Sequence, residues 1–304
     1  MYRKIRILLI MSCLVIFVQA NAQFDDPKTL EIGPHGGASY YMGDLNPVIP
    51  FAMADLQYGG LVRFNYNNRW TFRFDYSRAK VKADDTKLNW RPERGLNFTS
   101  TINDFSLVAE FNFLEYYTGN PKKNVSPYIF GGISVFQYTA YATVGDVLVD
   151  LSDHATEGPE DPNAKWYNKM FGKTSPIGVS IPFGFGVKFS LSRHMAATME
   201  WRMQKTFTDY LDDVATVYRP ETRHAFVVIN GLYYDLTDPS MTPTGLPTDA
   251  NGNPSPSIQI EDYHYKGNQQ RGNSAFNDWF GMARVSLTWK FNLPDGRGCN
   301  LSKF

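Results

Sequence analysis

Carboxylates gather in the stretch QKTFTDYLDDVATVY, residues 204–218, where Asp209, Asp212 and Asp213 lie within five positions beside aromatic residues. Closely spaced carboxylates can bind a hard cation or take part in acid–base catalysis. Short acidic side chains also cap turns where a strand ends. The elements that hold these aspartates decide which role they have.

A histidine paired with an acidic residue is a second candidate for a catalytic site. The adjacent residues Asp153 and His154 are the nearest approach to an acid–base dyad. Together with Asp212 and Asp213 they loosely resemble the set used by outer-membrane proteases. Neighbouring residues of an extended backbone point in opposite directions, so Asp153 is poorly placed to orient His154. No motif singles out a serine with a neighbouring base, as a lipid hydrolase needs. We therefore expect no enzymatic activity.

A metal is the third possibility. The sequence DANGN, residues 249–253, places oxygen ligands around a glycine. It lacks the regular spacing and the closing glutamate of an EF-hand loop. The surrounding Pro, Thr, Ser, Gly and Asn indicate a solvated loop. We expect no metal and no cofactor.

The first residues carry an export signal. Arg3, Lys4 and Arg6 precede an apolar run from residue 7 to 18, and Ala20-Asn21-Ala22 provides a cleavage pattern before Gln23. We expect a signal peptide at residues 1–22 and one domain at 23–304. Because the whole chain has 30 basic and 30 acidic residues, losing three basic ones leaves it mildly acidic. Neither charge nor export favours nucleic acid as a partner.

Aromatic residues make up 15% of the chain, and many of them alternate with polar ones. In VRFNYNNRWTFRFDYSR, residues 62–78, bulky apolar and polar positions alternate on both sides of a tight turn. This period of two predicts strands. Eight such segments are found, at residues 30–41, 56–66, 70–77, 105–113, 127–141, 181–191, 197–204 and 281–291.

The connections distinguish a membrane barrel from a soluble sandwich. Short ones at residues 67–69, 115–126 and 192–195 alternate with long ones at residues 42–55, 80–101, 142–180 and 208–277. A sandwich has no reason to sort its loops in this way. The pattern predicts an all-β fold, an eight-stranded antiparallel transmembrane β-barrel with short periplasmic turns and long extracellular loops in the outer membrane, surrounded by its lipid.

Charged residues then fall on the face that lines the lumen, and side chains fill the interior of a barrel this small. Both signs occur, so we expect a paired network of Arg63, Arg73, Asp75, Glu110, Lys188, Glu200, Arg202 and Arg284. Aromatic residues near the short-turn ends fit an interfacial girdle; they are Trp70, Tyr116, Tyr117, Trp289 and Phe291.

Four stretches resemble the PorG-like family of outer-membrane barrels of the type IX secretion system: YYMGDLNP (40–47), SPYIFGGISVF (126–136), IPFGFGVKFSLS (181–192) and TDYLDDV (208–214). GDLN and TDYLDDV are the specific pieces. The resemblance implies a small barrel without enzymatic activity that lies over the periplasmic ring of the secretion machinery and contacts its lipoprotein component. It identifies no catalytic or ligand residue.

The leading hypothesis is thus a non-enzymatic component of this secretion machinery. Lys122 and Lys123, in the largest short connection, are the candidate contact with the periplasmic ring. Two alternatives remain, an adhesin or binding module that acts through the external loops and, with less support, an outer-membrane hydrolase. The two specific motifs leave strands at the same rim, where we expect a structural role for Gly43, Asp44, Asp209, Tyr210, Asp212 and Asp213.

Overall fold

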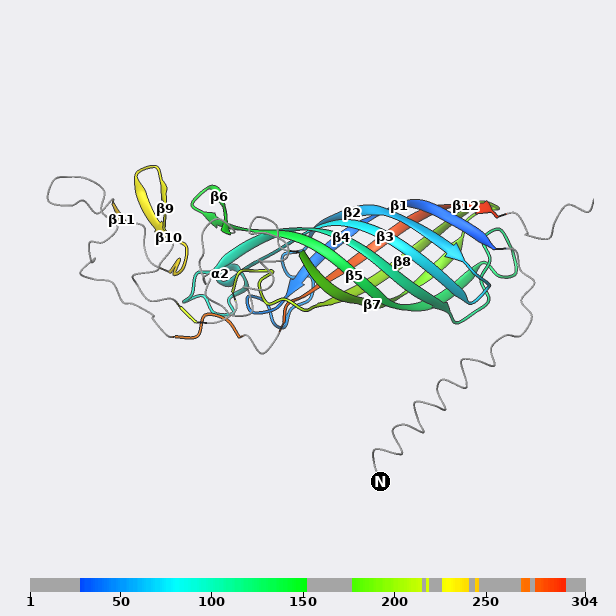
Figure 1. Ribbon diagram of the computed structural model, residues 1–304, viewed down its shortest axis with the longest axis horizontal. Helices are drawn as coiled ribbons and strands as arrows, with labels where there is room; N and C mark the ends of the chain where they lie inside the picture. Colours follow the sequence, from blue (N-terminus) through cyan, green and yellow to red (C-terminus); the bar gives the residue numbers. More distant parts are fainter. Residues whose placement is uncertain are drawn as a thin grey trace, which may run out of the picture.

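The computed structural model describes residues 28–151, 177–214, 217–218, 226–240, 244–245, 269–273 and 277–293. Eight antiparallel strands form a closed barrel (Figure 1): β1 (Thr29–Met42), β2 (Asp55–Asn65), β3 (Trp70–Asp84), β4 (Asn97–Asn112), β5 (Val125–Val144), β7 (Ile177–Ser190), β8 (Met195–Thr206) and β12 (Trp279–Asn292). Each strand pairs with two neighbours, and the pairings of β1 with β12 and of β4 with β5 close the ring. The predicted eight-stranded antiparallel barrel is confirmed.

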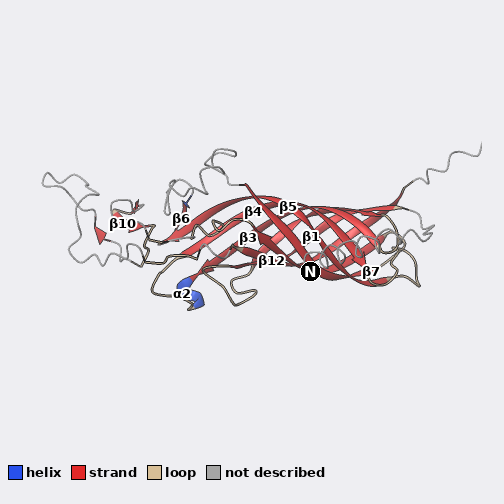
Figure 2. Ribbon diagram, turned by 60° about the horizontal axis from the view of Figure 1, so that its bottom comes forward, coloured by secondary structure: helices blue, strands red, loops and turns tan. Residues whose placement is uncertain are grey.

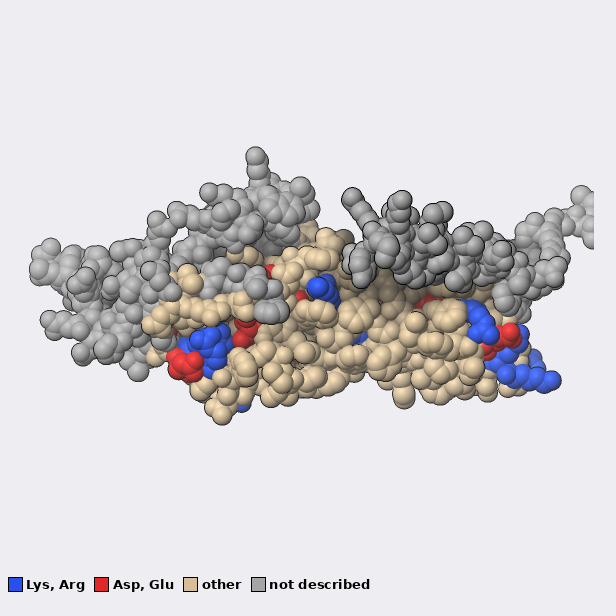
Figure 3. Space-filling model, turned by 90° about the horizontal axis from the view of Figure 1, so that it is seen from below, with Lys and Arg blue, Asp and Glu red and all other residues tan. Residues whose placement is uncertain are grey.

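The outer wall is apolar and the inside is polar, the reverse of a soluble sheet. On β3, Phe72 and Phe74 are 47% and 49% exposed, whereas Arg73 and Asp75 are 1% and 0% exposed. Water would favour the opposite arrangement, so this wall is suited to lipid. Figure 3 shows a largely uncharged wall, with most of the charged side chains in view gathered toward the two ends.

Short connections lie at one end of the barrel and long ones at the other, as the sequence predicts. We call these the short-turn end and the long-loop end (Figure 1). The strands reach further toward the long-loop end than expected, because β3 continues to Asp84 and β4 begins at Asn97. The loop predicted over residues 80–101 is therefore shorter than expected, because residues 80–84 and 97–101 belong to strands. Lys80 and Lys82 are outward-facing charges on a strand whose inner positions, Val81 and Ala83, remain buried.

Several short elements of secondary structure lie at the long-loop end (Figure 2). Helix α2 (Asp85–Leu88) follows β3 directly, and β6 (Val147–Asp150) folds back on β5. A separate sheet contains β9 (Phe226–Ile229), β10 (Leu232–Asp235) and β11 (Thr244–Gly245). Asn230 and Gly231 join β9 to β10 with positive φ angles of 52° and 79°, which fits the two-residue turn that Asn-Gly favours. Among the described residues, no helix is long and apolar enough to span a membrane.

The interior has two layers. Along the inner face of β3, Arg73, Asp75 and Ser77 are followed by Ala79, Val81 and Ala83. The charged layer lies toward the short-turn end. The apolar layer lies toward the long-loop end and contains Tyr41, Leu45, Phe98, Ile102, Phe136, Leu211, Val214, Phe280 and Met282. A hydrophobic core therefore closes one half of the lumen and ion pairs fill the other.

Aromatic rings from β5 also fill part of the lumen. The rings of Tyr128 and Phe130 pack over Gly186 and Gly184 of β7, where an added Cβ would come within 2.8 Å and 2.9 Å of ring atoms. These glycines allow the rings to lie against the neighbouring strand, because Tyr128 and Phe130 are the register partners of Gly186 and Gly184. The barrel contains no open channel at this level, because Tyr128 and Phe130 are buried together with Val108 of β4.

Candidate functional site

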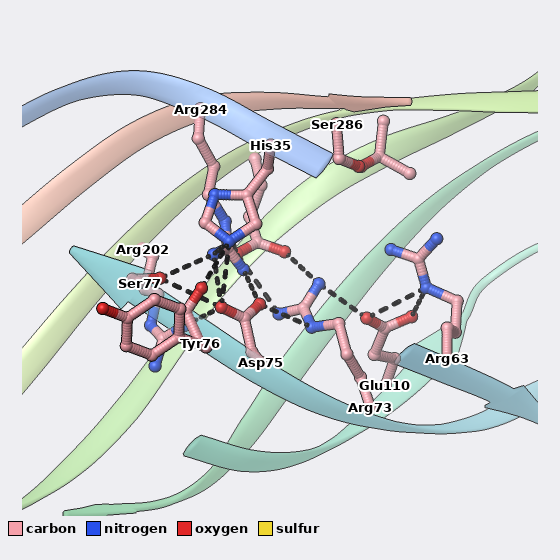
Figure 4. Close-up of polar contacts among 12 residues, drawn as sticks. His35, Arg63, Arg73, Asp75, Tyr76, Ser77, Glu110, Arg202, Arg284 and Ser286 are labelled. Atoms are coloured by element: carbon pink, nitrogen blue, oxygen red, sulfur yellow. Dashed lines mark hydrogen bonds and ion pairs between the residues drawn. The ribbon is translucent and has the colours of Figure 1, made fainter. Parts of the chain in front are cut away.

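The charged layer is built around Arg73 (Figure 4). Its Nη1 lies 2.7 Å from Glu110 Oε1 and 2.6 Å from Glu200 Oε2. These partners come from β4 and β8, so one guanidinium bridges strands on different sides of the lumen. Arg284 of β12 repeats the arrangement, with Nη2 2.6 Å from Asp75 Oδ2 and 2.7 Å from Glu200 Oε1. The planar guanidinium suits such multiple contacts.

Further pairs extend the network along the barrel. Arg63 lies 3.1 Å from Glu31 and 3.2 Å from Glu110. Lys188 Nζ lies 2.6 Å from Glu110, and Arg202 Nη2 lies 3.1 Å from Asp104. Five cations, Arg63, Arg73, Lys188, Arg202 and Arg284, thus face five carboxylates, Glu31, Asp75, Asp104, Glu110 and Glu200. Balanced pairing avoids an isolated buried charge, which would be costly.

Every member of the predicted lumen set lies in this network, and three further members were missed. Glu31, His35 and Asp104 are buried beside it, and His35 Nε2 lies 3.2 Å from Asp75 Oδ1. The signal that could have found them is their place in the alternation, since residues 31 and 35 share one face of β1. Glycines and Pro34 obscure the alternation there.

The chemistry open to this layer is limited. Its carboxylates are already held by cations or hydroxyl groups, as when Tyr128 donates to Glu200 over 2.7 Å and Thr118 donates to Glu31 over 2.6 Å. Within the described ranges, no group of three or more His, Cys, Asp or Glu side chains is arranged to hold a metal ion. The arrangement can stabilise a packed barrel and fix the positions of its strands.

The connection between β4 and β5 closes the short-turn mouth. Tyr116 is 4% exposed, and Lys188 Nζ lies 5.8 Å from the centre of its ring. Lys290 donates a hydrogen bond to the carbonyl of Thr118. The prediction that Tyr116 belongs to a lipid-facing girdle is therefore wrong, because this connection folds inward over the lumen. Trp289 and Phe291, each 49% exposed, do lie on the outer wall.

The two candidate contact lysines differ in their surroundings. Lys123 Nζ forms an ion pair with Glu115 over 3.0 Å. Lys122 is exposed, and its backbone N–H donates to the Asn120 side chain over 2.9 Å. Since the side chain of Lys122 extends from a turn that is itself anchored to the barrel, it is the more accessible of the two charges.

At the long-loop end, the two specific motifs meet. Tyr41 of β1 is hydrogen-bonded through its hydroxyl to Asp212 Oδ2 over 2.5 Å and to Asp278 Oδ1 over 2.6 Å. The same carboxyl groups accept from the backbone, Asp212 from Val214 N–H and Asp278 from Leu211 N–H, each over 3.0 Å. The segment 208–214 is thereby fixed over the lumen, with Leu211 and Val214 in the apolar layer.

Burial raises the pKa of both Asp212 and Asp278 well above the ordinary value. The charge of Asp278 raises the pKa of Asp212 further, and the charge of Asp209 raises that of Asp278. A tyrosine hydroxyl has one hydrogen and can donate to only one of the two acceptors. The contact of Tyr41 with both groups is satisfied when one carboxyl is protonated and donates to the hydroxyl.

The remaining rim residues are held by backbone contacts. Asp44 accepts a hydrogen bond from Asn273 N–H over 2.7 Å, and Gly43 lies where a Cβ would collide with Tyr41 and Asp278. Asp213 has a left-handed φ of 60°, and its carbonyl accepts from Arg271 Nη1 over 2.6 Å. Asp209 is nearly buried, and Tyr210 N–H donates to Thr208 Oγ1 over 3.2 Å.

Two arginines tie the long loops together. Arg94 pairs with Asp85 over 2.6 Å, and its other donors reach the carbonyls of Arg271 and Asp44. Arg271 in turn donates to the carbonyls of Thr237 and Asp213. Arg94 lies between β3 and β4, Asp44 lies between β1 and β2, and the other carbonyls lie between β8 and β12, so these contacts join three connections in the described parts of the rim. Sequence inspection missed both arginines, since each lies in a loop without periodicity.

Several sequence hypotheses lie outside the described residues. They are the signal peptide at 1–22, the dyad of Asp153 and His154, and the DANGN sequence at 249–253.

Comparisons with known proteins give a family and a set of similar folds. A family model described as a domain of unknown function, DUF6089, matches residues 5–157. No curated protein matches the chain. Among solved structures, the N-terminal β-barrel domain of Pseudomonas aeruginosa OprF is similar at 10% identity and a TM-score of 0.33, covering 86% of this chain and 97% of that one.

Two other solved structures are similar to the same degree. For Neisserial surface protein A the identity is 10%, the TM-score 0.36 and the coverage 87% of this chain and 97% of that one. For Ail of Yersinia pestis, solved with a heparin analogue, the identity is 8%, the TM-score 0.35 and the coverage 88% of this chain and 99% of that one. Because these TM-scores are low, the assignment of the barrel fold depends on the strand pairings of this chain and not on the similar structures.

Proposed function

The chain belongs to the DUF6089 family, and we propose that it is a non-enzymatic barrel of the outer membrane that serves the type IX protein secretion machinery. In this proposal the short-turn end faces the periplasm and contacts the periplasmic ring, including its lipoprotein. The long-loop end faces the outside. The lipid-suited wall and the export signal expected at residues 1–22 support the outer membrane as its location.

The closed lumen carries this proposal. Ion pairs around Arg73 fill one half and the apolar layer around Phe136 fills the other. A barrel packed in this way cannot pass a protein or a solute through its centre. Its contribution must come from its surfaces, as expected of an assembly or anchoring component.

The meeting of the two motifs supports the resemblance to the PorG-like family. GDLN and TDYLDDV are more than 160 positions apart in sequence, yet Leu45 and Leu211 share the apolar layer and Tyr41 contacts Asp212. The residues that carry the resemblance therefore belong to one structural unit. This unit anchors the long loops.

Charge replacement at the short-turn end tests the periplasmic contact. Lys122→Glu should reduce recovery of the periplasmic ring components with the purified barrel, because it reverses an exposed charge on the anchored turn. The matched control is Lys87→Glu, a 70% exposed lysine at the opposite end. Equal recovery with both variants and the unaltered protein would contradict the proposed contact.

A second candidate function is a binding module that acts through the external loops. The observation in its favour is the cross-linking of these loops by Arg94 and Arg271, since a preorganised surface binds at a lower entropic cost. Deletion of residues 238–256 separates the two functions. It should abolish adhesion in this alternative, whereas secretion should persist in both.

A further inference from the structure

A pocket of about 620 Å³ opens on the outer wall at the long-loop end. Its floor contains Met42 of β1, Met203 of β8 and Trp279 of β12. Their neighbours in sequence, Tyr41, Arg202 and Phe280, point into the lumen. Because side chains alternate along a strand, Met42, Met203 and Trp279 face outward. The roof consists of residues from the long connections, among them Pro47, Trp90 and Arg91.

The pocket is continuous with the lipid-facing wall. Phe183 of β7 pairs with Met203, and its ring lies 6.0 Å from that of Trp279 at an angle of 87°. Phe183 and its neighbour Ile181 are 38% and 42% exposed on the same wall. A molecule that enters the pocket from this side therefore comes from the bilayer. An apolar floor beside lipid fits an acyl chain.

Two cations lie at the margin of the pocket. Lys205 Nζ lies 5.7 Å from the centre of the Trp279 ring and is exposed on the outer wall. Arg91 lines the roof, and its side chain, 38% exposed, contacts Glu93 over 3.3 Å. An exposed ion pair of this kind is weak, so Arg91 can exchange Glu93 for a stronger anionic partner.

We propose that this pocket binds a phosphate-bearing lipid of the surrounding leaflet, with one acyl chain on Met203 and Trp279 and the phosphate between Arg91 and Lys205. The arrangement places an apolar floor beside two cations. Arginine and lysine are the side chains that proteins use for phosphate. The inference rests on the transmembrane fold and is independent of any role in secretion.

The test uses the full-length barrel in a nonionic detergent, with retained lipid counted by native mass spectrometry. The probe is phosphatidylglycerol, and diacylglycerol with the same chains and inorganic phosphate are the comparisons. We expect one retained phosphatidylglycerol, bound roughly tenfold more tightly than diacylglycerol, the ratio that one charge-assisted hydrogen bond provides. Inorganic phosphate at the same concentration should not displace it.

Two variants locate the lipid. Arg91→Gln with Lys205→Gln should reduce the affinity for phosphatidylglycerol to that for diacylglycerol. Met42→Trp should abolish retention of both by filling the pocket. The matched control, Arg78→Gln with Lys80→Gln, removes two exposed charges from β3 and should retain the lipid. Heat-modifiable migration in a gel confirms folding of each variant. Unchanged retention by folded Met42→Trp, or displacement by inorganic phosphate, would overturn the proposal.

Discussion

The hydroxyl of Tyr41 lies 2.5 Å from Oδ2 of Asp212, and this contact joins the first strand of the barrel to its longest connection. Asp278, at the start of β12, completes the arrangement from the other side. The tyrosine's own hydrogen and a proton on one of the two carboxyl groups link the three groups and hold the segment 208–214 over the lumen. The rim is therefore sensitive to protonation.

Loop anchoring should weaken as pH rises. The folded protein raises the pKa of Asp212 and Asp278, so their stabilising contribution is fully present below the unfolded pKa of about 4. It is lost as pH rises through the folded pKa. Hydrogen exchange of residues 207–214 measured across this range should show protection falling with increasing pH.

Asp278→Asn should remove most of this pH dependence. Asparagine keeps an acceptor for Leu211 N–H and supplies a donor for Tyr41, so it imitates the protonated carboxyl. The control is Asp84→Asn at the end of β3, which lies apart from Tyr41. Protection of residues 207–214 that varies with pH as strongly in Asp278→Asn as in the unaltered protein would refute the protonated carboxyl group.

Glu200→Gln should destabilise the barrel by about 3–5 kcal/mol, the usual effect of breaking a buried ion pair from one side. Glu200 contacts Arg73 and Arg284, and both guanidinium groups would lose a charged partner in a dry layer. Urea unfolding of the barrel in lipid vesicles measures the difference.

The matched control is Glu115→Gln. Glu115 pairs with Lys123 at an exposed site. Because water screens the two charges there, the pair contributes little to stability. Its unfolding midpoint should stay close to that of the unaltered protein. Equal midpoints for Glu200→Gln and Glu115→Gln would show that the lumen network does not stabilise the barrel.

The reconstituted protein should not conduct ions across a planar bilayer. Tyr128 and Phe130 are buried inside the barrel beside the ion pairs, and the apolar layer closes the long-loop half. No conductance steps are expected in concentrated KCl, whereas a porin of known conductance serves as the positive control. Regular steps that scale with the number of inserted barrels would contradict a closed lumen.

Most of the barrel could be predicted from alternation, because outward apolar and inward polar residues take turns along each strand, as where Phe72 and Phe74 flank Arg73. Lysines near the end of β3 misled the prediction, since an outward charge at Lys80 was mistaken for the beginning of a loop. The Asn-Gly turn at 230–231 was a local signal that went unused. Strand ends depend on which side chains remain paired across the sheet, and a single sequence does not contain that information.

The site residues that lie on strands could be predicted from the sequence, whereas those brought together by the loops could not. The lumen residues follow from their positions in the alternation. Tyr41 and Asp278 belong to the rim only because segments more than 230 positions apart meet there. Tyr116 illustrates the same limit, since nothing in EYYTGNPKKNVS indicates that its turn folds inward.

The most direct test of the proposed role is the secreted proteome of a strain that lacks this gene. Export by the type IX system should fail, with its cargo retained in the periplasm, and the unaltered gene should restore export. A gene carrying Lys87→Glu should restore it equally, whereas one carrying Lys122→Glu should restore it only partly. Normal export of cargo in the deletion strain would contradict the account.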